Sequence, residues 1–211
     1  MMKWTEEMIR QCSKPTGELG RIVGKKMNES HIELWKWGLG HISIKERSTI
    51  LDIGCGGGKA IKLLYSLSKK GKVFGIDYSK EMVQLSQEVN NDLIKRSKVE
   101  ILHGSVSSLP FANNMFDFVT AFETYYFWPD LINNLKEIKR VLKPDGTLIM
   151  VNETYRHEKF AERNSYLSKL LDMRYDSPGE FHGFLFEAGY TLIKIITVPE
   201  KNWITAIAKK P

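Results

Sequence analysis

From Thr49 onward, short runs of β-branched and apolar residues alternate with stretches that carry helical spacing. The runs that predict strands are Thr49–Ile53, Lys72–Ile76, Val99–His103, Phe116–Thr120 and Thr147–Asn152. The stretches that predict helices are Lys59–Leu67, Lys80–Asn90 and Asp130–Leu142. Such alternation is typical of the α/β class, in which helices cover a parallel sheet. We expect Gly71 to end the first of these helices in a left-handed conformation, and residues 143–146 to turn the chain into the fifth strand.

The end of the chain predicts a hairpin. Thr191–Val198 and Trp203–Ala208 are apolar, β-rich runs with only four residues between them. A parallel pair needs a crossover of a dozen or more residues, so we expect these strands to be antiparallel and the sheet to be mixed. Residues 1–48 show no strand pattern and predict a helical cap on a core domain at residues 49–211.

Composition narrows the class of protein. The 211 residues are 42% hydrophobic and 27% charged, a balance that favours one globular core. The absence of an apolar leader, and of any apolar run near the ~20 residues that cross a bilayer, favours a cytoplasmic protein. The two cysteines, Cys12 and Cys55, exclude a disulfide framework and a four-thiolate zinc site. The net charge of +6 is spread thinly, which disfavours a nucleic-acid partner.

The most informative stretch is the strand-to-helix junction at residues 50–59, ILDIGCGGGK. Glycines at such a junction let backbone amides approach a ligand, although a plain tight turn would use them as well. A dinucleotide fingerprint would require glycine where this chain has Lys59. Asp52 stands two residues before Gly54, where a carboxylate would repel a pyrophosphate and would suit an ammonium group.

Further candidates follow the ends of the next strands. Asp77 ends the second strand, where a carboxylate can accept hydrogen bonds from both hydroxyls of a ribose; a helix cap is the alternative. Tyr78 and Met82 lie just beyond and could flank an adenine, and residues 104–106 offer a turn and a hydroxyl. After the fourth strand, residues 120–129 are so aromatic that they predict a pocket wall, although any single ring could pack in the core.

Together these motifs resemble the class I S-adenosylmethionine-dependent methyltransferases, in particular the small stand-alone type related to quinone-biosynthesis C-methyltransferases. The resemblance covers about residues 48–209 and includes residues 137–148, EIKRVLKPDGTL, which are similar to that family's turn into strand five. It implies a doubly wound, Rossmann-like sheet of seven strands in the order 3-2-1-4-5-7-6, with strand seven antiparallel. It also implies S-adenosylmethionine as cofactor and S-adenosylhomocysteine as product.

The resemblance assigns Asp52 and the glycine loop to the methionine end of the cofactor, Asp77 to the ribose, and Ser105 with Val106 to the adenine. Many relatives carry an acid where this chain has Ser105. The motifs and the resemblance together give these expected cofactor-binding residues: Asp52, Gly54, Cys55, Gly56, Gly58, Asp77, Tyr78, Met82, Gly104, Ser105, Val106 and Phe122.

The expected reaction is in-line transfer of a methyl group to an unidentified small-molecule acceptor, which depends mainly on alignment and on exclusion of water. The catalytic candidates are Glu123, Tyr126 and His31, although His31 could be structural and Glu123 could cap the next element. No metal is expected. Residues 10–48, in which Asn28 is a candidate for the acceptor side, are expected to form a lid over the acceptor, with a helix packed permanently against the sheet as the alternative.

Other functions stay open at this point. They are methyl transfer to RNA or protein, and a non-catalytic cofactor-binding role on the same fold. A nicotinamide-dependent oxidoreductase is disfavoured by Lys59 and Asp52. Methylation at cytosine C5 needs a cysteine near the fourth strand, where the chain has none.

Overall fold

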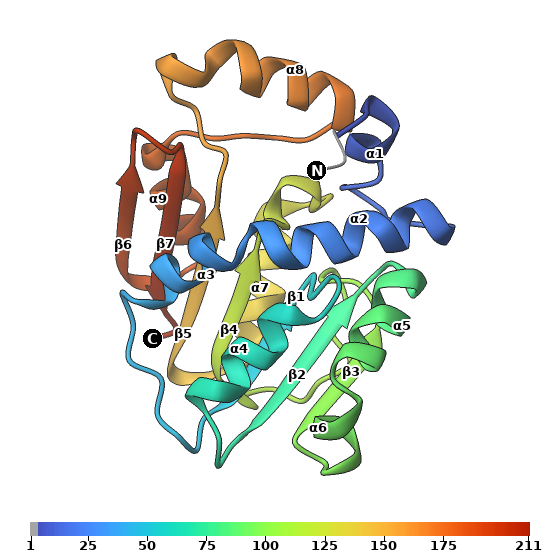
Figure 1. Ribbon diagram of the computed structural model, residues 1–211. Helices are drawn as coiled ribbons and strands as arrows, with labels where there is room; N and C mark the ends of the chain where they lie inside the picture. The colour runs from blue at the N-terminus through green and yellow to red at the C-terminus, as the bar shows by residue number, and fades with distance from the viewer. Residues whose placement is uncertain (1–3) are drawn as a thin grey trace.

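The computed structural model describes residues 4–211 and shows a sheet of seven strands in the order β3-β2-β1-β4-β5-β7-β6 (Figure 1). The strands are β1 Thr49–Ile53, β2 Lys72–Asp77, β3 Val99–His103, β4 Phe116–Phe122, β5 Leu142–Asn152, β6 Thr191–Val198 and β7 Trp203–Lys209. Strands β1 to β5 are parallel, and β7 runs antiparallel to both β5 and β6. The expected mixed, doubly wound sheet and its order are confirmed.

Helices lie on both faces of the sheet. They are α1 Glu6–Arg10, α2 Gly17–Ser30, α3 Ile32–Leu39, α4 Lys59–Leu67, α5 Lys80–Val89, α6 Asn91–Lys95, α7 Leu131–Val141, α8 Ala161–Leu171 and α9 Pro178–Glu187, with 3-10 turns at Tyr125–Phe127 and Glu158–Phe160. Leu34 of α3 and Ile61 of α4 pack on one face, and Ile138 of α7 packs on the other. Helices α1 and α8 lie at the carboxyl edge of the sheet (Figure 1), where Arg10 Nη1 donates to the Leu170 carbonyl over 3.2 Å. No helix in the described part of the chain is long and apolar enough to span a membrane.

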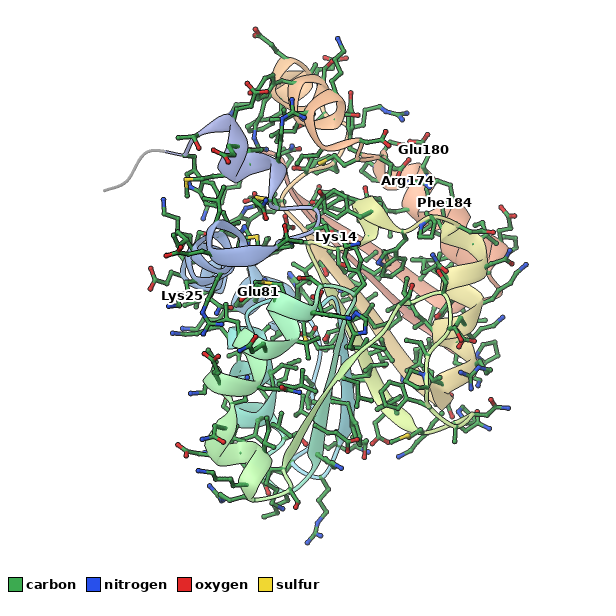
Figure 2. The ribbon with its side chains drawn as sticks, turned by 90° about the vertical axis from the view of Figure 1, so that its right-hand side faces the viewer. Lys14, Lys25, Glu81, Arg174, Glu180 and Phe184 are labelled. Carbon is green, nitrogen blue, oxygen red and sulfur yellow. The ribbon has the colours of Figure 1, made fainter. Side chains whose placement is uncertain are left out.

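Side-chain caps fix the start of helix α9, which packs on β6 and β7. Ser177 Oγ accepts a hydrogen bond from the Glu180 backbone N–H, and the Glu180 carboxylate accepts one from the Ser177 backbone N–H. This reciprocal pair satisfies two donors that a helix start leaves free. The Arg174 guanidinium lies over the Phe184 ring at 4.8 Å, so the segment before α9 is held against the helix (Figure 2).

Two local expectations need correction. Helix α4 ends at Leu67, and Gly71 has no positive φ; its glycine is needed because a Cβ atom there would collide with the Ser48 carbonyl. Strand β5 begins at Leu142 rather than at Thr147, because the chain pairs with β4 on both sides of a register shift. The patterns also gave no prediction for α8 and α9.

The reversal of strand order at β1 determines where a ligand site is expected. Strand β1 pairs with β2 on one side and with β4 on the other, so Ile53 has Ile76 and Ala121 as its neighbours across the sheet. Ligands in doubly wound sheets bind beyond the carboxyl ends of the strands at such a reversal. The segments that follow β1, β2, β4 and β5 therefore define the region in which a site is expected.

Helix α3 packs so closely on β5 that one added methyl group should destabilise the fold. A Cβ atom at Gly38 would collide with Val151, whereas one at Gly183 in α9 would have nothing within 4 Å. We expect Gly38→Ala to lower the free energy of unfolding by about 1–3 kcal/mol through overpacking. The control Gly183→Ala should leave it unchanged or raise it by up to about 1 kcal/mol. Urea unfolding of both variants measures this, and a Gly38→Ala variant as stable as the wild type would contradict the fixed packing of α3.

Candidate functional site

Three adjoining cavities lie at the carboxyl edge of the sheet. The loop cavity, of about 80 Å³, is lined by residues 54–57. The strand-end cavity, of about 280 Å³, is lined by residues 104–106. The α8 cavity, of about 470 Å³, is lined by Leu167 and Leu171 among others. Phe127 lines all three, so the cavities adjoin one another.

The glycine loop adopts a conformation that other residues rarely reach. Gly54, Gly56 and Gly58 all have positive φ, at 67°, 51° and 81°. A Cβ atom at Gly54 would collide with Thr124, while one at Gly56 would meet only the Gly54 carbonyl at 4.0 Å. Gly56 therefore keeps its backbone open to a ligand. Gly58 instead packs against α5 and lies outside the three cavity linings.

The cap holds this loop from above. Asn28 Nδ2 donates to the Gly57 carbonyl over 2.9 Å, and Asn28 Oδ1 accepts from the Lys59 backbone N–H over 3.1 Å. Helix α2 is held in turn by α5, where Arg21 pairs with Glu81 at 3.4 Å; Glu81 is labelled on α5 in Figure 2. Asn28 was expected near the acceptor, but in the structure its side chain forms hydrogen bonds with the glycine loop.

Asp77 connects the second strand to the glycine loop. Its Oδ2 accepts from the Gly56 backbone N–H over 2.8 Å, and its Oδ1 accepts from the Ser79 N–H over 2.8 Å. Burial raises the pKa of Asp77, and these two backbone donors oppose the rise. The N-cap of α5 is Ser79, whose hydroxyl accepts from the Met82 N–H. Asp77 is thus not the residue that caps α5, and it faces both the loop and the strand-end cavities.

Asp52 lies at the floor of the loop cavity, almost fully buried. Thr120 Oγ1 donates to its carboxylate over 2.6 Å. Burial raises the pKa of Asp52 to about 7, with the hydrogen bond from Thr120 opposing this and the charge of Asp77 adding to it. A cationic group placed beside Asp52 would favour its ionised form.

The remaining expected cofactor residues are distributed over the first two cavities. Cys55, Met82 and Phe122 are buried in the lining of the loop cavity. Gly104, Ser105 and Val106 line the strand-end cavity, and the hydroxyl of Tyr78, whose residue lines both, donates to the Ser13 carbonyl of the cap. Ser105 is exposed, and its hydroxyl accepts from the Ser107 N–H over 3.2 Å. All of these except Gly58 thus come together around two connected cavities.

The three catalytic candidates meet where the loop cavity joins the α8 cavity. His31 and Glu123 line both, and Tyr126 lines the α8 cavity. Tyr126 donates from its hydroxyl to the two Glu123 carboxylate oxygens, each at 3.3 Å. Glu123 has a positive φ of 57° directly after β4, which turns its carboxylate back toward this junction. One acid that no motif indicated, Glu153, lies among them, with its carboxylate 3.7 Å from His31 Nε2.

The charges of this cluster are strongly coupled. The pKa of Glu123 is raised to about 8, mainly by burial and also by the neighbouring charge of Glu153, while His31 opposes the rise. Burial disfavours a charged His31, but its pairing with Glu153 and the charge of Glu123 outweigh this and raise the pKa of His31. Burial also disfavours a charged Glu153, but His31 and Arg163 outweigh this and lower its pKa. Near neutral pH Glu123 is therefore mostly protonated, and the pairing with Glu153 favours the charged form of His31.

The α8 cavity is mostly apolar, with this cluster at its inner end. Its apolar side chains come from the cap, from the turn after β4 and from α8: Trp4, Ile9, Met27, Phe127, Leu167, Leu171 and Met173. Of the aromatic run after β4, Tyr126 and Phe127 line it, Trp128 lines the strand-end cavity, and Tyr125 is buried in the core. The cavity thus suits an apolar molecule with one polar group.

Sequence reasoning missed Glu153, Thr154 and Arg163, which all line the α8 cavity. The Glu153 N–H donates to Glu123 over 2.5 Å, and the Thr154 N–H donates to the Tyr126 hydroxyl over 3.1 Å. One signal was available, because Glu153 directly follows β5, the neighbour of β4 in the sheet. Arg163 lies on α8, whose place over the cavity comes from tertiary packing alone.

Comparison with known proteins agrees with this geometry. The family model described as a methyltransferase domain matches residues 51–150. A demethylmenaquinone methyltransferase from Bacillus velezensis is 35% identical over 173 residues, which cover 80% of this chain and 66% of that protein. One from Bacillus cereus is 33% identical over 192 residues, which cover 90% of this chain and 78% of that protein. The chain therefore spans about two thirds of the length of the first relative.

A solved structure shows the same fold over the whole chain. The crystal structure of an S-adenosylmethionine-dependent methyltransferase from Aquifex aeolicus has a TM-score of 0.73 at 24% identity, covering 99% of this chain and 100% of that one. The sheet order, the glycine loop and the sequence relatives thus lead to one family. The chain belongs to the S-adenosylmethionine-dependent methyltransferases.

Proposed function

We propose that this protein methylates a hydroxylated aromatic ring of the quinol type, held in the α8 cavity, and that it uses S-adenosylmethionine bound across the loop and strand-end cavities. The observation that carries the proposal is the position of Glu123 and His31, which line both the loop cavity and the apolar α8 cavity. A methyl donor and an acceptor placed on the two sides would meet at these side chains.

The residues of the first two cavities fit the cofactor. Gly56 leaves an open cradle for the chain between sulfur and ammonium, and Asp52 offers a carboxylate to the ammonium group. Asp77 faces both cavities, so its carboxylate can accept from the ribose hydroxyls while Gly56 and Ser79 hold it in place. Residues 104–106 and Trp128 would surround the adenine. The bound cofactor supplies an activated methyl group on a sulfonium.

The acceptor class follows from the α8 cavity together with the relatives. A cavity of about 470 Å³ lies within the usual range for small-molecule sites, and its apolar walls favour an aromatic or alkyl body. The cluster at its inner end would receive a hydroxyl group. Relatives that are 33% to 35% identical are demethylmenaquinone methyltransferases, whose name places a quinone-type ring in this role. We therefore assign a quinol ring carbon as the acceptor.

Within this assignment Glu123 accepts the hydroxyl proton. Removing that proton makes the ring carbon more nucleophilic, and Tyr126 and the Glu153 N–H orient the carboxylate. The cap and α8 cover part of the cluster, and an acceptor bound in the α8 cavity would displace water from the rest, which strengthens the charge interactions there. No described residue needs to activate the methyl group itself.

The assignment of Glu123 predicts a pH dependence. Because the carboxyl pKa is about 8, the proton-accepting form increases as pH rises, so kcat/KM should rise with pH and level off above about 8. The assay follows methyl transfer from labelled S-adenosylmethionine to a reduced naphthoquinol that has an unsubstituted ring carbon beside the hydroxyl. Glu123→Gln should lose about a hundredfold or more in kcat and should lack this limb. The exposed control Glu187→Gln should keep the wild-type kcat and the wild-type pH profile. A wild type that never methylates the quinol would refute the acceptor class.

The assignment of Asp77 predicts a binding defect. Asp77→Ala removes the acceptor for two ribose hydroxyls, and loss of hydrogen bonds to a charged group costs roughly 1.5–3 kcal/mol, or about tenfold to a hundredfold in affinity. Calorimetry with S-adenosylhomocysteine measures the change. The control Glu100→Ala removes an acid from β3 that pairs with Lys72 away from the cavities. Unchanged affinity in a folded Asp77→Ala variant would show that this carboxylate only holds the glycine loop.

We also propose that residues 10–48 form a lid, with a moving part at 10–30 and an anchored part at α3. Leu34 and Leu39 of α3 are buried in the core, whereas Cys12 and Met27 line the loop and α8 cavities. Amide exchange should therefore slow in 10–30 when S-adenosylhomocysteine binds, and stay slow in α3 with or without it. Equal protection of 10–30 in both states would show a permanently packed cap instead.

A further inference from the structure

Glu153 occupies a point at which three segments meet. It directly follows β5, and its Oε1 lies 3.7 Å from His31 Nε2 at the end of α2 and 3.7 Å from Arg163 Nη2 on α8. Its backbone N–H donates to Glu123 Oε1 over 2.5 Å. The side chain lines the α8 cavity but not the loop cavity. Glu153 thus faces the acceptor side of the junction.

A quinol that loses its hydroxyl proton here would develop negative charge beside two carboxyl groups. The ligand atoms of His31, Glu123 and Glu153 all lie within 4.8 Å of one another. Like charges this close disfavour a second or third anion unless a cation balances them. Of the three, His31 is the side chain that can be that cation.

The surroundings of His31 leave Glu153 as its partner. Both Glu123 oxygens already accept from Tyr126, and one also accepts from the Glu153 N–H. Cys12, which lines the same two cavities, has its pKa raised to about 12 by burial and by the charges of the two glutamates, so it stays neutral. The Trp35 ring, 6.0 Å from the imidazole, carries no charge. Arg163 pairs with the same Glu153 oxygen as His31 does.

We propose that Glu153 is a positioning residue of the methyl-transfer reaction, which pairs with His31 across the cavity junction and holds it as the cation that balances the acceptor oxygen. His31 then serves as an electrostatic partner of the oxyanion and not as the base. The role toward the acceptor oxygen rests on the proposed function, whereas the pairing of Glu153 with His31 does not.

The step balances without a further reactant. Glu123 takes the hydroxyl proton, and the electron pair left on oxygen delocalises to the ring carbon. That carbon forms its bond to the methyl carbon as the methyl–sulfur bond breaks, with the electron pair staying on sulfur. The ring carbon then loses its proton to solvent, and Glu123 returns its proton to the oxygen. His31 keeps its proton throughout, and one proton is released in each turnover.

The test uses Glu153→Gln in the full chain, with Glu158→Gln as a control that removes the same charge from the neighbouring turn. The variant keeps the backbone N–H that holds Glu123. Its first readout is the NMR titration of the His31 imidazole, with the exposed His182 as internal reference. We expect His31 to titrate above the usual value of about 6.5 in the wild type and in Glu158→Gln, and clearly lower in Glu153→Gln.

The second readout is turnover of the quinol. Glu153→Gln should lower kcat about tenfold or more while the affinity for S-adenosylhomocysteine stays unchanged, because the glutamate acts only on the acceptor side. An unchanged His31 titration, or an unchanged kcat, would overturn the proposal. A His31 signal that Mn²⁺ broadens selectively, with activity abolished by a chelator, would overturn it in favour of a metal site. If the wild type fails to methylate the quinol while His31 titrates as expected, the acceptor assignment fails and the pairing stands.

Discussion

The pairing of β1 with β4 is the constraint on which the site depends. With β2 on its other side, β1 occupies the reversal of strand order, and the segments after all three strands must leave the sheet at one edge. Helices that follow β1 and β4 diverge to opposite faces, which leaves room between them for a ligand. The glycine loop and Glu123 directly follow β1 and β4, and Asp77 is the last residue of β2. Their proximity is thus a property of the strand order.

The same edge concentrates acids that would be costly to bury alone. An uncompensated buried charge costs several kcal/mol, so a protein retains one only with a partner or in its neutral form. Asp52 and Glu123 are held partly neutral by burial, with pKa values of about 7 and 8. Asp77 is held by backbone N–H donors, and Glu153 by His31 and Arg163. For an acid held partly neutral, a ligand can supply the missing positive charge, as an ammonium group would at Asp52.

The predictable part of this molecule is the part encoded locally. Apart from the start of β5, the strand bounds follow closely from periodicity and turn chemistry, as do the hairpin and the glycine loop. The resemblance supplied the strand order. Gly71 misled because its glycine serves a close contact with Ser48 rather than a helix end. Asn28 was taken for an acceptor-side residue because its bonds to the glycine loop cross about thirty positions of sequence. Glu153 was missed because its partner His31 lies in the cap and no local pattern joins the two.

The cap connects the two halves of the reaction. Asn28 and His31 lie one helical turn apart at the end of α2, so they share a face and cannot move independently. The first bonds the loop proposed to hold the cofactor, and the second pairs with Glu153 at the acceptor cavity. One helix thus positions side chains for both cavities, and α3, whose Leu34 and Leu39 are buried in the core, is the fixed point from which α2 extends.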